Sequence, residues 1–161
     1  MTAEAPTAPA ASDTSVRDGV PYGRLVPVAV HFDDLDAFGL LHNARYPLLV
    51  ERAWTEVLAG LGFTFDGDWE AAGDACNVVR ELTIGYEAPV KRAGEYAVHL
   101  WFERLGSTSL GYGFRFCSAD GAETYARGSR VLVRIEAGSG RPTPWSDAFR
   151  DAARALLRPA G

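Results

Sequence analysis

Lysine, cysteine and long apolar runs are all scarce in this sequence of 161 residues. Lys91 is the single lysine, and the net charge of -5 argues against a nucleic-acid partner, because such proteins concentrate basic side chains. Two cysteines, Cys76 and Cys117, are too few for a disulfide scaffold, so we expect two reduced, mostly buried thiols. No apolar run approaches the roughly 18 residues that a membrane span needs. These shortages exclude nucleic-acid binding and a membrane span from our expectations.

Residues 1–22 differ in composition from the rest of the chain. Residues 1–13 are rich in Ala, Pro and Thr, and they lack the basic start and apolar centre of a signal peptide. Such a composition is typical of a disordered tail. The remaining residues, 23–161, are enough for one domain with a hydrophobic core. We therefore predict a disordered tail followed by a single cytoplasmic domain.

Alternating apolar and polar residues, which indicate half-buried strands, recur five times along the chain. In the first strand one face is expected to hold Val26, Val28, Val30 and Phe32, and in the second strand one face is expected to hold Val78, Arg80, Leu82, Ile84 and Tyr86. Short connections between the later strands favour antiparallel neighbours. Apolar residues at three-and-four spacing predict a long helix after the first strand, and a shorter helix closes the chain. The expected order is strand 25–32, helix 43–61, strands 77–87, 95–105, 109–118 and 123–136, and helix 143–157. This is an α+β pattern, in which the long helix buries its apolar stripe against one antiparallel sheet.

The long helix has two plausible starting points. Asn43 is a good N-cap, because its side-chain oxygen can accept a hydrogen bond from a first-turn amide. Pro47 instead favours a cap at Tyr46, because proline is easiest to place at the first helical position. Either start leaves a polar loop between the first strand and the helix.

This loop, residues 31–46, holds most of the candidate chemistry. Asp33, Asp34 and Asp36 are possible metal ligands, but hard cations need about six or more oxygen ligands and the loop has no glutamate at a matching spacing. We therefore predict no metal site, and we interpret Asp33 and Asp34 as turn residues.

Three other arrangements are weaker candidates. The serines of residues 106–111 lack the spacing of a nucleophile elbow and lie between two strands. His31 and His99 lie on strands, where structural histidines are common, whereas His42 lies at the helix entrance and its role stays open. No strand is followed by a glycine-rich phosphate loop. The sequence thus predicts no cofactor.

Asp36 and the helix entrance form the strongest candidate site. A helix N-terminus exposes unpaired amides and a partial positive charge, which suit a developing oxyanion. Gly39 lies between Asp36 and Asn43 and lets the chain curl, so that the carboxylate and the amide can face one point. These are the minimum groups for acyl transfer from an activated ester. An Asx-type turn at Asp36 with a plain cap at Asn43 explains the same residues structurally and stays open.

The stretch Asp34-Leu-Asp-Ala-Phe-Gly-Leu-Leu-His-Asn-Ala-Arg-Tyr46 resembles the motif D-x-D-x-x-G-H-V-N-N-x-x-Y. That motif opens the central helix of the hotdog-fold acyl-CoA thioesterases, in particular the 4-hydroxybenzoyl-CoA thioesterase-like group. The resemblance covers about residues 24–136, and the order of the predicted elements matches as well. It implies a hotdog fold, in which an antiparallel five-stranded sheet wraps around one long central helix; here a short C-terminal helix follows.

The resemblance also implies roles for four residues of the loop and the helix start. Asp36 matches the catalytic aspartate of the family. Asn43 stands where a backbone amide polarises the thioester carbonyl. Gly39 matches the glycine that permits the tight turn, and Tyr46 matches an aromatic residue of the first helical turn.

Other positions match less closely. Leu40 replaces the histidine that follows the glycine in the family, and His42 replaces the first of the paired asparagines. We keep His42 as a candidate substrate-binding residue. The hairpin residues Arg104, Ser107 and Ser109 stand where some members contact the CoA phosphates.

The sequence therefore predicts an acyl-CoA or acyl-carrier-protein thioesterase that needs no cofactor. Asp36 would act as nucleophile or as general base, and the resemblance implies a homodimer or homotetramer with the site at a subunit interface. One alternative is a hotdog protein that binds acyl-CoA or acyl carrier without hydrolysing it. Another is a hotdog dehydratase, for which His42 is the candidate histidine.

Overall fold

The computed structural model describes residues 20–160. Residues 1–19 of the predicted tail lie outside this range, so the disordered tail stays a prediction. Tyr22, inside the predicted tail, already contacts the sheet: its carbonyl oxygen accepts a hydrogen bond from His99 Nε2 at 2.7 Å.

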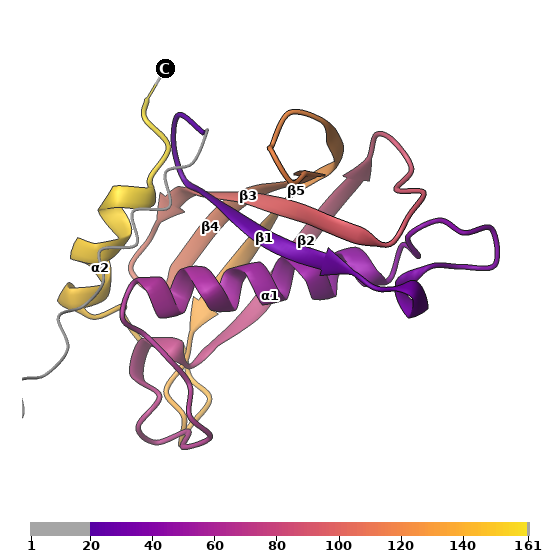
Figure 1. The fold of residues 1–161 in the computed structure, drawn as a ribbon. Coiled ribbons are helices and arrows are strands. Elements are labelled where there is room, and N and C mark those ends of the chain that lie inside the picture. The colour runs from indigo at the N-terminus through magenta and orange to yellow at the C-terminus, as the bar shows by residue number, and fades with distance from the viewer. Residues whose placement is uncertain (1–19, 161) are drawn as a thin grey trace, which may run out of the picture.

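Five antiparallel strands form one sheet in the order β1-β3-β4-β5-β2, as Figure 1 shows. Alternation along each strand sends large apolar side chains to the concave face, and Tyr112, Phe114 and Phe116 of β4 are fully buried there. Pro27 lies on β1, an edge strand, where its missing amide costs little. The strands are β1 (Arg24–Val30), β2 (Asn77–Tyr86), β3 (Gly94–Leu105), β4 (Ser109–Ser118) and β5 (Thr124–Arg134).

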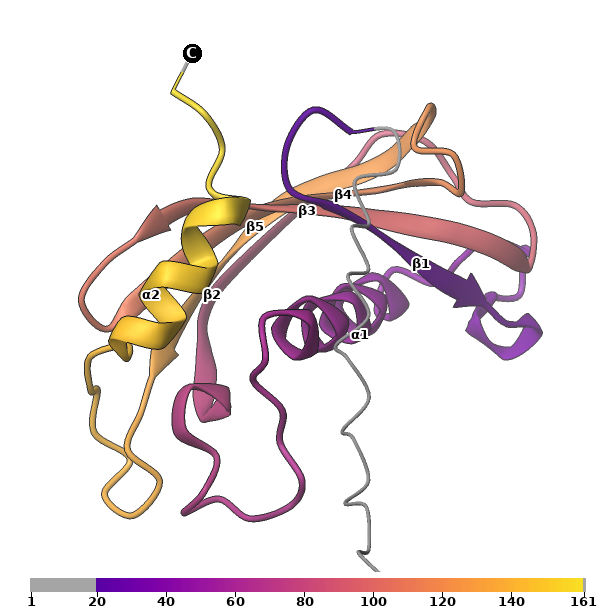
Figure 2. The same ribbon diagram turned by 60° about the vertical axis from the view of Figure 1, so that its left-hand side comes forward.

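One long helix, α1 (Arg45–Gly60), lies in the concave side of the sheet (Figure 2). Its apolar stripe is buried against the strands, and Trp54 stacks on Tyr112 with ring centroids 5.3 Å apart. Gly62, at a φ of +91°, ends the helix in the left-handed conformation that glycine adopts easily. The predicted α+β architecture, with one helix against a five-stranded antiparallel sheet, is thereby confirmed.

Two local predictions about strand faces are wrong. Phe32 was expected on the buried face of the first strand, but the strand ends at Val30 and Phe32 is 86% exposed on a short 3-10 turn. In β2, a register shift between Val79 and Glu81 exchanges the two faces, so Val78 does not share a face with Leu82. Period-two alternation cannot anticipate a bulge, because the bulge inserts one extra residue.

The closing helix also begins later than predicted. The helix α2 spans Asp147–Ala153, because the side chain of Ser146 caps it by accepting a hydrogen bond from the Phe149 amide. Thr143 is instead held in extended chain by a hydrogen bond from its amide to the Arg134 carbonyl. No helix within residues 20–160 is long and apolar enough to cross a membrane.

Candidate active site

A cavity of about 460 Å³ opens where the β1–α1 loop meets the start of α1. We call it the helix-entrance cavity. Six residues between Asp36 and Tyr46 line one side, and residues 86–89 at the end of β2 line the other. Its volume lies in the range usual for small-molecule sites. The cavity thus joins the segment singled out in the sequence to an edge strand that lies forty residues further along the chain.

Asp36 is held in this cavity by its own loop. Its Oδ1 accepts hydrogen bonds from the amides of Phe38 at 2.8 Å and Leu40 at 3.1 Å. Gly39, at a φ of +75°, closes the turn, and its amide donates to the Asp36 carbonyl at 2.9 Å. The Asx-type turn therefore exists, but it uses only one carboxylate oxygen. Oδ2 accepts no hydrogen bond from any residue between 20 and 160.

The amide of Asn43 is an open donor at the helix entrance. The neighbouring amides are occupied: His42 donates to the Asp34 carbonyl, Ala44 to His42 Nδ1, and Arg45 to the His42 carbonyl. Within the described chain, the Asn43 N–H has no acceptor. The bond from Arg45 to the His42 carbonyl polarises the peptide that carries this N–H, which strengthens it as a donor.

The predicted cap at Asn43 is wrong, and so is the alternative at Tyr46. The N-cap of α1 is Ala44, which has no capping side chain. His42 takes over part of that task, because its Nδ1 accepts the Ala44 amide at 3.1 Å. Pro47 falls at the third helical position, where the amide of a first-turn residue would have no partner in the helix. The helix therefore begins with an open N-terminus.

Tyr46 forms the buried wall of the cavity. Its side chain is 4% exposed, and burial, with a smaller contribution from Tyr86 and Tyr96, raises the pKa of its hydroxyl. The hydroxyl therefore stays protonated at neutral pH. Tyr86 packs edge-on against the Tyr46 ring with centroids 5.1 Å apart. Together the two rings make this side of the cavity aromatic.

Charged groups around the cavity are largely paired. Asp34 is buried and accepts the His31 amide at 2.8 Å, while its other oxygen lies 3.5 Å from Arg45 Nε. The turn role predicted for Asp34 thus extends to fixing the first residue of α1. On the opposite wall, hydrogen bonding from Arg127 lowers the pKa of Glu87. Among residues 20–160, no three His, Cys, Asp or Glu side chains gather as a metal-ligand group.

The hairpin residues Arg104, Ser107 and Ser109 are not near this cavity within one chain. Val30 pairs with Gly94 at the start of β3, so the loop after β1 lies at that end of the sheet. The hairpin follows Leu105, at the other end of β3, roughly 35 Å away at the usual rise of a strand. Their predicted contact with CoA phosphates stays a prediction.

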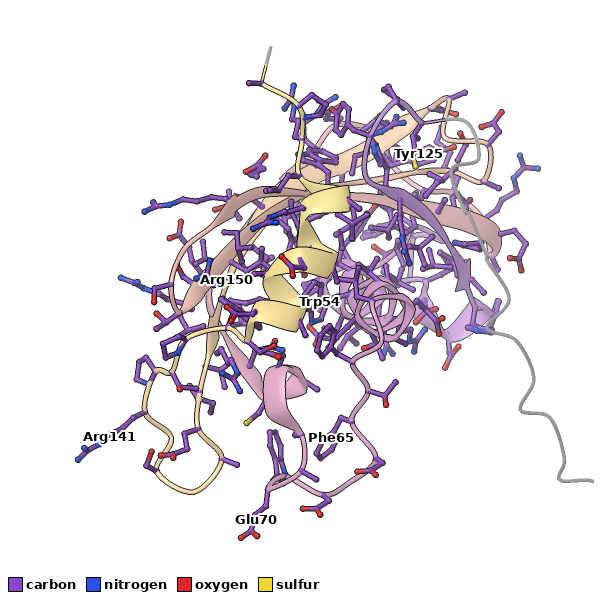
Figure 3. The ribbon with its side chains drawn as sticks, turned by 90° about the vertical axis from the view of Figure 1, so that its left-hand side faces the viewer. Trp54, Phe65, Glu70, Tyr125, Arg141 and Arg150 are labelled. Carbon is purple, nitrogen blue, oxygen red and sulfur yellow. The ribbon has the colours of Figure 1, made fainter. Side chains whose placement is uncertain are left out.

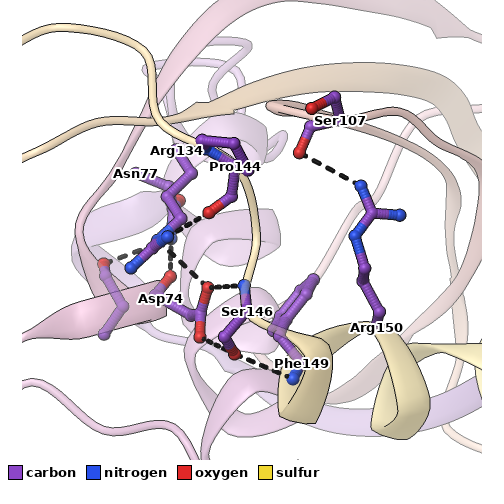
Figure 4. Close-up of polar contacts among 9 residues, drawn as sticks. Asp74, Asn77, Ser107, Arg134, Pro144, Ser146, Phe149 and Arg150 are labelled. Carbon is purple, nitrogen blue, oxygen red and sulfur yellow. Dashed lines mark hydrogen bonds and ion pairs between the residues drawn. The ribbon is translucent and has the colours of Figure 1, made fainter.

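The hairpin lies instead beside α2, at the end of the molecule that Figure 3 faces. The Arg150 guanidinium donates to the Gly106 and Ser107 carbonyls at 2.7 and 3.2 Å. Asp74 is buried nearby, paired with Arg134 at 3.0 Å and hydrogen-bonded by the Ser146 amide at 3.0 Å (Figure 4). This end is a closed structural junction.

The wall from residues 86–89 was missed in the sequence. Tyr86 was expected on one face of a strand, but nothing in its local pattern places it beside Asn43. Only the pairing of β2 at the sheet edge, followed by the turn that takes Val90 to the Leu41 amide at 2.9 Å, brings these segments together. Such a long-range juxtaposition has no signal in a single sequence.

Sheet, helix and cavity together define a class of protein. A curved antiparallel sheet wrapped around one central helix is the hotdog fold. The profile of the thioesterase superfamily matches residues 38–125. The acyl-CoA thioester hydrolase YbgC of Escherichia coli is 31% identical over 107 residues, which are 66% of this chain and 77% of YbgC. The chain belongs to the thioesterase superfamily.

Solved structures agree with this assignment. The PA5185 protein of Pseudomonas aeruginosa superposes with a TM-score of 0.78 at 26% identity, covering 87% of this chain and 95% of its own. A thioesterase from Thermus thermophilus, complexed with coenzyme A and Zn, gives a TM-score of 0.68 at 30% identity, covering 89% and 99%. The hotdog fold and the thioester hydrolase predicted from the sequence are confirmed at the level of the family.

Proposed function

We propose that the protein hydrolyses acyl-CoA thioesters in the helix-entrance cavity, with Asp36 and the Asn43 amide as the reacting groups. One observation carries the proposal: Asp36, with one carboxylate oxygen unpartnered in the described chain, and Asn43, with an unpartnered amide there, line the same cavity. The relatives support the substrate class, because YbgC is an acyl-CoA thioester hydrolase and the Thermus thermophilus thioesterase is complexed with coenzyme A.

The chemistry requires charge stabilisation at one atom and attack at another. The substrate carbonyl oxygen accepts a hydrogen bond from the Asn43 N–H, which stabilises the negative charge that develops there. By one route, an Asp36 oxygen bonds to the carbonyl carbon, the thiolate leaves, and water hydrolyses the resulting anhydride. By the other, Asp36 takes a proton from water as the water oxygen attacks, and that proton ends on the departing sulfur. Both routes regenerate Asp36.

The decisive test is Asp36→Asn. The amide oxygen of Asn can still accept the Phe38 and Leu40 amides, so the loop is preserved while the carboxylate is lost. We expect kcat to fall by about 10²- to 10⁴-fold, the usual contribution of a positioned acid or base. Thiol release from short, long and aromatic acyl-CoA esters measures the change and also defines the acyl preference.

Asp33→Asn is the matched control, because Asp33 is an exposed carboxylate of the same loop. It should hydrolyse all substrates at the wild-type rate. Near-wild-type turnover of Asp36→Asn would remove Asp36 from the mechanism. If the wild-type protein binds acyl-CoA tightly but releases no thiol from any substrate, the non-catalytic binding role replaces this proposal.

We also propose that two or four copies assemble, with β2 as the contact. β2 forms an open edge of the sheet, and its side chains Val79, Leu82 and Tyr86 are 48%, 37% and 53% exposed. A long apolar edge strand favours pairing with another strand, and natural proteins usually cover it. A second copy paired antiparallel at β2 would bring the start of its β2 beside Tyr86, at the rim of the cavity.

The cytoplasmic location stays a prediction.

Sedimentation velocity tests this assembly. The wild type should sediment as a dimer or tetramer, and Leu82→Lys should shift it towards the monomer, because a charge would be buried in the contact. Ala29→Lys, on the opposite edge strand β1, should leave the assembly intact. A monomeric wild type would contradict the proposal.

A further inference from the structure

The start of α1 carries a hydrogen-bonding deficit that its own sequence creates. Asn43 lies just before the N-cap Ala44, and an amide four residues later, at residue 47, is the donor that would extend the helical bonding back to the Asn43 carbonyl. Residue 47 is proline, which has no amide hydrogen. The Asn43 carbonyl therefore receives no amide donor from residue 47, and it belongs to the same residue as the open amide of the site.

Tyr86 supplies the missing donor from the edge strand. Its hydroxyl donates to the Asn43 carbonyl at 3.3 Å, across 43 residues of chain. The ring is fixed by its edge-on packing against Tyr46, with centroids 5.1 Å apart and planes at 73°. Both tyrosines line the cavity. The sheet edge is thereby tied to the helix entrance at one atom.

This bond completes the restraints on Asn43. On its N-terminal side, the His42 amide donates to the Asp34 carbonyl, and the His42 carbonyl accepts the Arg45 amide. On its C-terminal side, the described chain supplies the Tyr86 hydroxyl. When the peptide groups on both sides of a residue are held, its backbone dihedral angles are restrained and its N–H keeps one direction, and such preorganisation is what an oxyanion donor requires.

We propose that Tyr86 is a positioning residue for the oxyanion donor: its hydroxyl replaces the amide hydrogen that Pro47 cannot provide and so aims the Asn43 N–H into the cavity. The inference rests on the proposed function, since it gives Tyr86 a part in the same reaction. Tyr86 acts through Asn43 and does not touch the reacting atoms.

Tyr86→Phe tests the bond, because it removes the hydroxyl and keeps the ring against Tyr46. We expect kcat for acyl-CoA hydrolysis to fall about two- to tenfold, the range set by one hydrogen bond, with KM unchanged. Tyr96→Phe is the matched control: its hydroxyl also donates to a backbone carbonyl, that of Arg92 at 3.0 Å, but Tyr96 does not line the cavity. Its kcat should stay at the wild-type value.

Pro47→Ala distinguishes a positioning role of the Tyr86 hydroxyl from a general contribution of Tyr86 to the fold. It restores an amide at residue 47, which can donate to the Asn43 carbonyl and so extend the bonding of α1 back by one residue. In this background, Tyr86→Phe should change kcat by less than about twofold, because the hydroxyl is now redundant.

The proposed function and this inference can fail separately. Asp36→Asn tests the proposed function, whereas the Tyr86 and Pro47 variants test the inference in an enzyme whose wild type is active. A wild-type kcat in Tyr86→Phe would overturn the inference. So would an equal loss of kcat in the Pro47→Ala background, because Tyr86 would then act on the substrate directly. A rise in KM with kcat unchanged would also overturn it and would make Tyr86 a substrate-binding residue.

Discussion

The polar groups near the two ends of α1 differ in how completely they are hydrogen-bonded. At the N-terminal end, one oxygen of Asp36 and the amide of Asn43 have no partner within the described residues. At the C-terminal end, both oxygens of the buried Asp74 are engaged, by the Ser146 amide, the Ser146 hydroxyl and Arg134. In the proposed function, the unpartnered groups at the first end are the reacting ones, whereas the hydrogen bonds at the second end hold α2 in place. The proposed function and the stability of the fold thus depend on different ends of the molecule.

Aromatic packing follows the same division. Trp145 stacks on Phe149 with centroids 4.3 Å apart, and Phe63 meets Phe149 edge-on at 5.3 Å, so the C-terminal end is filled. At the N-terminal end, Tyr46 and Tyr86 also pack edge-on, but they border a cavity. We therefore expect substitutions at the two ends to separate stability from activity.

The largest effect on stability is expected from Asp74→Ala. It removes the partner of Arg134 and leaves a mostly buried guanidinium unpaired, which should lower the free energy of unfolding by about 3–5 kcal/mol. Urea denaturation measures the change, and kcat of the folded fraction should be unaltered. Asp151→Ala, which breaks only an exposed pair with Arg154, should cost about 0–1 kcal/mol. Similar losses in both variants would mean that the junction contributes little.

A sharper comparison uses one glycine at each end. Gly39 and Gly62 both have positive φ, +75° and +91°, and a Cβ added at either would meet nothing within 4 Å. Alanine at either position should therefore cost about 1–2 kcal/mol of backbone strain and no more. Only Gly39→Ala should also reduce kcat, because Gly39 lies in the turn that joins Asp36 to the helix entrance. Equal kcat values in the two variants would show that the turn geometry does not govern the reaction.

The smallest effect concerns pH and lies at neither end. His99 is buried on the outer face of the sheet, where its Nε2 donates to the Tyr22 carbonyl and its Nδ1 accepts from Arg115 Nε. Burial lowers the pKa of His99 below its ordinary value of 6.5. Below that pH the unfolded chain binds a proton that the folded chain resists. Stability should be full above pH 6.5, fall as the pH drops towards the folded-state pKa, and then level off.

Comparing the wild type with His99→Gln isolates this term, because the variant has no ionisable side chain at residue 99. The difference in unfolding free energy between the two proteins should change between neutral and mildly acidic pH. If that difference is constant over this range, the protonation of His99 does not contribute to the loss of stability at acidic pH.

Much of this architecture follows from local pattern. Alternation marked the five strands, and three-and-four spacing marked the buried face of α1, because each element buries one face. The misplaced faces of Phe32 and Val78 arise where the pattern is interrupted by a 3-10 turn or a bulge. The start of α2 depended on Ser146, whose capping bond depends on local geometry that spacing alone does not fix.

The residues of the candidate site also fall into two groups: those close together in the sequence, which could be predicted, and those brought together by the fold, which could not. Asp36, Gly39 and Asn43 lie within one short loop, so spacing alone suggested that they share a site. Tyr86 meets them only through the pairing of distant strands, and no spacing rule reaches that far. The hairpin residues show the converse, since the predicted members of one site lie at opposite ends of β3.

In the turn between β3 and β4, the backbone carbonyl oxygens are all hydrogen-bonded. Each of its four carbonyls, from residues 106–109, already accepts a hydrogen bond, from the Arg150 guanidinium, the Trp145 and Arg134 amides, or the Gly106 amide. Two of the four donor residues, Trp145 and Arg150, come from the chain that follows β5. The carbonyl oxygens of the turn are therefore already paired within the chain, and part of that pairing depends on Arg150 of the C-terminal helix.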